Sequence, residues 1–227
     1  VECDVEIDAS NVDAMRARRD ESDVYCPDEA ASQAIRDHIH QAKRAKDTVG
    51  GLCEVHVFGC PIGLGSCMHW DEKLDSRIAG AVMGIQAFKG VEIGLGKEVA
   101  RHRGSEVHDP IEYDATRRDE PCLGFTRPRD HAGGLEGGMT DGMPVVVRGT
   151  MKPIATLMRG LPSVNLVTRS PEKSQYERSD ISAIAAASVV AENVVALEIA
   201  RALRQKFGGD SMEEVRAQLE TYLEMAR

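Results

Sequence analysis

Apolar residues recur at helical spacing in four stretches of the chain, and each stretch predicts an α-helix. The predicted helices cover residues 28–47, 72–89 and 182–206, and a last one begins after Ser211, with Val215, Leu219 and Leu223 on its apolar face. Asp28 is placed to cap the first helix, and Ser211 with Glu214 forms a capping box for the last. Three of the helices are followed by glycine, which is typical of a helix end. These glycines are Gly50-Gly51, Gly90 and Gly208-Gly209.

Shorter stretches alternate between apolar and polar residues or are continuously apolar, which predicts β-strands. They cover residues 1–8, 52–58, 91–93, 145–148 and 163–168. Residues 101–131 are polar and lack periodicity, so we expect a long loop there. The pattern predicts mixed helix and strand content in one compact domain over residues 1–227, without a separate second domain.

The second predicted helix contains Gly80 and Gly84, four residues apart. Glycine destabilises a helix interior, so two of them indicate close packing against a backbone or a ligand.

Residues 132–142 form the most unusual segment, with five glycines in eleven residues directly before the apolar run 145–147. Such a backbone can adopt positive φ and approach another group closely. The segment is neither a Rossmann fingerprint nor a P-loop, since no Gly-Lys-Ser/Thr closes it. Two interpretations stay open at this point: a cradle for an anion or cofactor, and a tight turn between strands.

Two later segments carry charges that suit an anionic ligand. Lys152 precedes Pro153, which favours an extended backbone from which the ammonium group can reach a phosphate. Arg178 and Asp180 are two residues apart, so an extended segment points both side chains the same way. The alternative for Lys152 is a solvated surface lysine. The alternative for Arg178 and Asp180 is a helix cap with a surface ion pair.

The composition limits the kinds of partner that the chain is expected to bind. The formal net charge of −9 argues against broad binding to nucleic acid or to anionic membranes. No apolar run has membrane-spanning length. None of the six cysteines forms a Cys-x-x-Cys pair and none of the seven histidines has metal-ligand spacing, so we expect reduced thiols, a cytoplasmic protein and no metal site.

Taken together, several motifs in one order closely resemble the chorismate synthase family along essentially the whole chain. They are Gly63-Leu64-Gly65-Ser66, His69-Trp70-Asp71, Gln86-Ala87, residues 89–94, residues 104–109, the glycine segment, Met151-Lys152-Pro153-Ile154 and Glu177-Arg178-Ser179-Asp180.

The resemblance implies a carbon-oxygen lyase that converts 5-enolpyruvylshikimate 3-phosphate to chorismate and phosphate by 1,4-anti elimination. It implies reduced FMN as cofactor, NADP as an associated nucleotide, and a role in aromatic amino acid biosynthesis. The implied fold is α+β, a β-α-β sandwich with antiparallel sheets around a helical core, usually assembled as a homotetramer.

The resemblance also implies roles for individual residues. Asp180 is the catalytic acid, expected near the flavin N5. The implied FMN-binding residues are Gln86 and Ala87 on the glycine-containing helix, Gly137, the segment Lys152, Pro153, Ile154, Ala155 and Thr156, and Arg178.

Two departures from the family pattern change what we expect for the activity and the ligand affinity of this chain. The family's amino-terminal motifs, including both catalytic histidines, have no counterpart here, so the chain is expected to be a carboxy-terminal portion with weak or no activity alone. An alternative is a truncated, non-catalytic flavin-binding relative. Asp130 and Asp141 stand where the family usually has asparagine, which predicts weaker binding of anionic FMN or substrate at neutral pH.

Overall fold

The computed structural model describes residues 1–227. The α-helices are α1 (Val12–Glu21), α2 (Glu29–Arg44), α3 (Leu74–Met83), α4 (Gly104–Val107), α5 (Ile184–Phe207) and α6 (Met212–Ala226). The strands are β1 (Gly51–Val57), β2 (Phe88–Ile93), β3 (Glu112–Tyr113), β4 (Phe125–Thr126), β5 (Leu135–Glu136), β6 (Met139–Thr140), β7 (Val145–Met151), β8 (Pro162–Val164) and β9 (Pro171–Lys173). Two short 3₁₀ helices cover Gly96–Arg101 and Ala115–Arg117.

The chain divides into two compact units, and each is built from two separate stretches of sequence. Unit 1 comprises Val1–Cys53 and Thr150–Val189, and unit 2 comprises Glu54–Gly149 and Val190–Arg227. By sequence, β1, β7 and α5 each contribute residues to both units. The single domain expected over residues 1–227 stays a prediction.

One three-stranded sheet and three small hairpins make up the β-structure. The sheet has the strand order β1-β7-β2. The pairs β3–β4, β5–β6 and β8–β9 are antiparallel. The combination of helices with antiparallel hairpins is an α+β architecture, as predicted.

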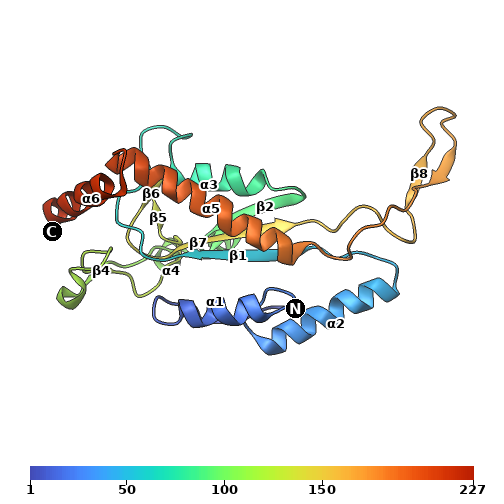
Figure 1. The fold of residues 1–227 in the computed structure, drawn as a ribbon, viewed down its shortest axis with the longest axis horizontal. Helices are drawn as coiled ribbons and strands as arrows, with labels where there is room; N and C mark the ends of the chain where they lie inside the picture. Colours follow the sequence, from blue (N-terminus) through green and yellow to red (C-terminus); the bar gives the residue numbers. More distant parts are fainter. The chain divides into compact units, whose positions relative to one another are not determined.

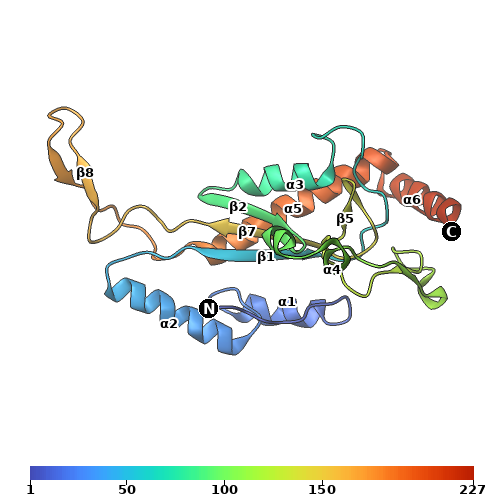
Figure 2. The same cartoon turned by 180° about the vertical axis from the view of Figure 1, so that it is seen from behind.

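The core of unit 2 forms where α3 packs along β2, side by side in both views (Figures 1 and 2). Leu74, Ile78 and Val82 are four residues apart, so they lie on one face of α3, and all three are buried. On β7, Val145 and Val147 alternate with less buried neighbours and are also buried. The apolar spacing of the sequence therefore encodes this packing directly.

Unit 1 is built on α2, whose start agrees with the prediction. The Asp28 carboxylate accepts a hydrogen bond from the Ala31 backbone N–H at 2.6 Å and so caps the helix. After α2, the Thr48 hydroxyl donates to the Ile154 carbonyl at 2.6 Å, which fixes the chain that leaves β7. The β8–β9 hairpin forms a narrow two-stranded ribbon of its own (Figure 2).

At the amino terminus the sequence prediction was wrong. Residues 1–8 form no strand, and the helix α1 follows, which the pattern did not predict. Alternating residues form a strand only with a partner to complete the hydrogen-bond ladder, and residues 1–8 pair with none. Helix α1 buries none of its residues, so it has no apolar stripe from which to recognise it.

Two further boundaries differ from the prediction. Helix α3 ends at Met83, six residues before the predicted end, because Gly84 terminates it. Strand β8 ends at Val164, since the Asn165 side chain accepts hydrogen bonds from the Val167 and Thr168 N–H groups, each at 2.9 Å, and turns the chain.

The segment expected to be a long loop, residues 101–131, contains α4, a 3₁₀ turn and the β3–β4 hairpin. All these elements are at most four residues long, too short for a periodic signal. No helix of the structure combines the length and apolar character that a membrane crossing requires.

Candidate functional site

The glycine segment folds as the hairpin β5–β6, with Gly137 and Gly138 as its two turn residues. Their φ angles are +61° and +87°, the left-handed region that a two-residue hairpin turn needs and that glycine adopts without strain. A side chain at Gly138 would collide with Lys73 and Ser66, whereas the space around Gly137 is open to 4 Å. The turn interpretation of the sequence is therefore correct, and the turn presents the exposed Gly137 backbone to any ligand.

Gln86 and Ala87 lie in the turn that follows α3, not on the helix as predicted. Ala87 has a φ of +70°, an uncommon conformation for a residue with a side chain. The hairpin contacts the other end of α3, where the Leu74 N–H donates to the Gly138 carbonyl at 2.9 Å. Ten helical residues separate the two sites, which corresponds to about 15 Å along α3.

Gly80 and Gly84 do not pack closely against another part of this chain. A side chain at Gly80 would meet nothing within 4 Å, and one at Gly84 would meet only carbonyls of its own helix. Of the two explanations for these glycines, packing against the chain's own backbone is wrong, and the approach of a ligand stays a prediction.

In unit 1, the structure brings the segment Lys152–Thr156 together with the residues around Arg178 and Asp180. The Thr156 hydroxyl donates to the Ser179 hydroxyl oxygen at 2.8 Å. The Ser179 hydroxyl in turn reaches the Thr156 carbonyl at 3.3 Å. Two of the predicted segments, more than twenty residues apart in sequence, thus lie side by side.

The charged side chains of these two segments are available to a ligand. Lys152, Arg178 and Asp180 are exposed, and none of them forms an ion pair in the structure. Pro153 and Ala155 are exposed as well, while Ile154 and Thr156 are half-buried. Two free cations close to small and apolar side chains suit a phosphate attached to a flat organic group.

A cluster of charges surrounds the glycine segment within unit 2. Asp109 is almost fully buried and accepts hydrogen bonds from the His131 and Ala132 N–H groups at 3.0 and 2.9 Å. Arg127 lies 2.8 Å from a Glu136 oxygen and 3.4 Å from an Asp141 oxygen. These contacts hold both ends of the segment, so the cluster explains why the hairpin has a defined place.

Asp130 and Asp141 both serve as backbone acceptors. Asp130 accepts from the Gly134 N–H at 2.8 Å and Asp141 from the Met143 N–H at 2.9 Å. Burial raises the pKa of Asp130 to about 6, and the nearby Asp141 and Asp109 carboxylates add to the effect. Burial also raises the pKa of Asp141, while Arg127 opposes that increase. Both carboxylates are thus costly to ionise, as expected for acids in positions that an amide fills equally well.

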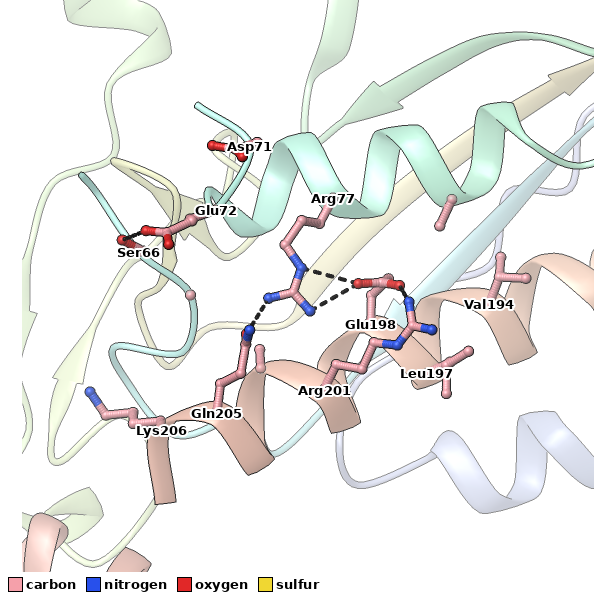
Figure 3. A pocket seen from close by; sticks show the side chains of 13 residues that line it. Ser66, Asp71, Glu72, Arg77, Val194, Leu197, Glu198, Arg201, Gln205 and Lys206 are labelled. Atoms are coloured by element: carbon pink, nitrogen blue, oxygen red, sulfur yellow. Dashed lines mark hydrogen bonds and ion pairs between the residues drawn. The ribbon is translucent and has the colours of Figure 1, made fainter. Parts of the chain in front are cut away.

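Sequence reasoning missed a cavity of about 840 Å³ between α3 and α5 in unit 2 (Figure 3). Arg77 extends from α3 and donates to Glu198 at 3.0 and 3.1 Å and to Gln205 at 2.6 Å, both on α5. Arg201 binds the other oxygen of Glu198. The motif residues Gly65, Ser66 and Asp71 also line the cavity. Arg77 is 121 residues from Glu198 in sequence, so no local signal could have joined α3 to α5.

Comparison with known proteins identifies the family to which the chain belongs. The family model for chorismate synthase matches residues 1–203. This chain belongs to the chorismate synthase family. The chorismate synthase of Desulforamulus reducens is 50% identical over 217 residues, which is 96% of this chain and 54% of that protein. The chorismate synthase of Geobacter sulfurreducens is 53% identical over 207 residues, 91% of this chain and 53% of that protein.

A solved structure agrees with the sequence comparison. A chorismate synthase crystal structure superimposes with a TM-score of 0.78 at 37% identity, covering 96% of this chain and 56% of that one. The predicted fold, that of a partial chorismate synthase, is thereby confirmed. The chain spans about half the length of the curated relatives that it matches.

The residues present fit FMN in their chemistry. Within unit 2, the open Gly137 turn leaves room for a flat group to approach the backbone. Within unit 1, Lys152 and Arg178 are exposed cations of the kind that binds a phosphate. Gln86, Ala87 and Gly137 belong to unit 2, and the other predicted FMN residues belong to unit 1. No group of three or more histidine, cysteine or acidic side chains is arranged to hold a metal ion.

Proposed function

We propose that this chain is the carboxy-terminal portion of a chorismate synthase, which converts 5-enolpyruvylshikimate 3-phosphate to chorismate and phosphate with reduced FMN. The family match over residues 1–203, with every predicted FMN residue inside it, carries this proposal. We further propose a cytoplasmic homotetramer in aromatic amino acid biosynthesis, with NADP as an associated nucleotide, as in the family.

When bound, reduced FMN would supply transient electron density for the proposed elimination of phosphate. Lys152 and Arg178 bind phosphate groups, because both are exposed cations without an ion-pair partner. Gln86, Ala87, Gly137 and the segment Pro153–Thr156 orient the flavin. Asp180 holds a proton at the flavin N5. The hydroxyl contacts between Thr156 and Ser179 keep the Lys152 and Asp180 segments in register.

The first test is turnover. The chain is mixed with reduced FMN and 5-enolpyruvylshikimate 3-phosphate, with and without the part of the Geobacter sulfurreducens relative that this chain does not match, and phosphate and chorismate are measured. We expect turnover only in the reconstituted mixture, because the chain lacks the family's two catalytic histidines. Removal of an acid-base group typically lowers the rate by about 10²–10⁴, which is the loss expected for Asp180→Asn. Asp4→Asn, at an exposed aspartate outside the site, is the matched control.

An FMN titration of the chain alone tests the binding half of the proposal. We expect Lys152→Met and Arg178→Met each to weaken binding roughly ten-fold or more, since charge-assisted hydrogen bonds contribute about 1.5–3 kcal/mol. Undiminished binding in the double variant would contradict the phosphate assignment. Binding without turnover in the reconstituted mixture would instead support the non-catalytic relative.

A further inference from the structure

Helix α6 lies beyond the stretch that the family model matches, yet it contacts the loop that supports the glycine hairpin. The Tyr222 hydroxyl on α6 donates to the Ile62 carbonyl at 3.2 Å. Its ring is held by Phe207, with ring centroids 5.5 Å apart, and by the Lys206 ammonium group, 4.2 Å from the ring centroid. The tyrosine therefore has little freedom to turn away from the loop.

The same loop is bound from its other side by Thr140 of strand β6. The Gly63 N–H donates to the Thr140 carbonyl at 2.7 Å, and the Thr140 N–H donates to the Leu64 carbonyl at 2.9 Å. The Thr140 hydroxyl donates to the Pro61 carbonyl at 2.6 Å and accepts from the Leu64 N–H at 2.8 Å. Thr140 and Leu64 are buried, so these bonds are shielded from water.

Gly63 shows how closely α6 approaches the loop. Its φ is +79°, and a side chain there would lie 2.7 Å from the Tyr222 hydroxyl and 3.1 Å from the Lys206 ammonium group. At the other end of the hairpin segment, a side chain at Gly142 would lie 3.0 Å from Ile62. Ile62 thus lies between Tyr222 and the glycine segment.

We propose that Tyr222 is a positioning residue that sets the glycine hairpin, and with it the backbone of Gly137, for contact with FMN. This inference rests on the proposed function. Strands β5 and β6 have two residues each, and a hairpin of that size is not stable by itself. Residues 61–64 therefore hold the hairpin through Thr140, together with the Leu74 bond to Gly138 and the charge cluster described above. Tyr222 fixes residues 61–64 from outside the site.

Hydrogen exchange of the 227-residue chain without flavin tests the positioning step. In Tyr222→Phe, which keeps the ring and removes the hydroxyl, we expect the amides of Gly63, Leu64 and Thr140 to exchange roughly three- to ten-fold faster, the effect of one hydrogen bond. Amides of α2, in unit 1, serve as the internal reference. Unchanged exchange at all three amides would overturn the proposal.

FMN titration of the same variants tests the consequence for the site. We expect Tyr222→Phe to raise the dissociation constant for FMN three- to ten-fold. Val215→Ala is the matched control, because it removes buried side-chain volume from α6 and leaves the Tyr222 hydroxyl in place. An equal rise in the control at an equal loss of stability would show that α6 acts only as general support, and would overturn the proposal.

A double variant of Tyr222 and Thr140 tests whether the two residues act on FMN binding through the same loop or independently. If Tyr222 acts through residues 61–64, Tyr222→Phe weakens FMN binding less in a Thr140→Val background than in the wild type. In that background, the loop has already lost its bonds to the Thr140 hydroxyl. Full additivity of the two changes in FMN affinity would overturn the proposal. If the wild-type chain binds no FMN, the proposed function fails for this chain, while hydrogen exchange still decides whether Tyr222 positions the hairpin.

Discussion

At the scale of single residues, Asp130 and Asp141 both serve as backbone acceptors, and Asp141 also faces the Arg127 guanidinium at 3.4 Å. Asp130 and Asp141 each accept one backbone N–H bond that a side-chain amide accepts equally well. The negative charge is the costly part, because both carboxylates are partly withdrawn from water and lie among other acids.

Asp130→Asn is therefore expected to stabilise the chain at pH 7. The raised pKa means that the folded state binds the Asp130 proton more tightly than the unfolded state, so wild-type stability from this group rises as pH falls from above 6 toward 4. After discounting for partial exposure, we expect a gain of about 1–2 kcal/mol in the free energy of unfolding at pH 7.

Urea unfolding between pH 4 and pH 8 measures this effect, with Asp4→Asn as the control for a change of net charge. The variant should lose the part of the pH dependence that lies between about pH 4 and pH 6. A curve that stays parallel to the wild type over this range would show that ionisation of Asp130 does not limit stability.

At the scale of elements, the β5–β6 hairpin depends on its two glycines in different ways. Both have positive φ, but only Gly138 is enclosed by other atoms. Gly137→Ala is expected to cost about 1–2 kcal/mol, the penalty for a side chain in the left-handed region.

Gly138→Ala should cost clearly more, because its side chain would lie 2.7 Å from the Ser66 carbonyl oxygen as well. Thermal unfolding of the two variants compares them directly. Equal losses of stability would contradict the tight contact at Gly138.

At the scale of the whole molecule, residues distant in sequence decide how the helices of unit 2 meet. Arg77 on α3 and Glu198 on α5 are 121 residues apart in sequence, and their side chains are only 16% and 8% exposed. A buried pair of this kind is destabilising to break and much less so to replace as a whole.

Glu198→Ala is expected to cost about 3–5 kcal/mol in the free energy of unfolding, because it leaves the Arg77 guanidinium buried without its carboxylate. The double variant Arg77→Leu with Glu198→Leu should recover most of that loss. Arg201→Ala, which removes the exposed partner of Glu198, should cost less than about 1 kcal/mol.

Denaturant unfolding of the four proteins provides the measurement. A double variant as unstable as Glu198→Ala would show that the cavity between α3 and α5 requires the ion pair itself and not only the absence of a lone charge.

The sequence by itself determined the features that depend on neighbouring residues. The Asp28 cap of α2, the Ser211 and Glu214 capping box of α6 and the apolar face of α3 were all predictable, because helix periodicity and capping act within a few residues. The ordered motifs also predicted the family, which the comparisons confirm.

Only the tertiary structure decided the features that need a distant partner. Residues 1–8 alternate like a strand but pair with no other strand, and α1 shows no apolar stripe. The contact of Thr156 with Ser179, the Arg77–Glu198 pair and the bond from Tyr222 to Ile62 join residues from 23 to 160 positions apart. No local pattern records such contacts, because their energy is realised only when folding brings the two segments together.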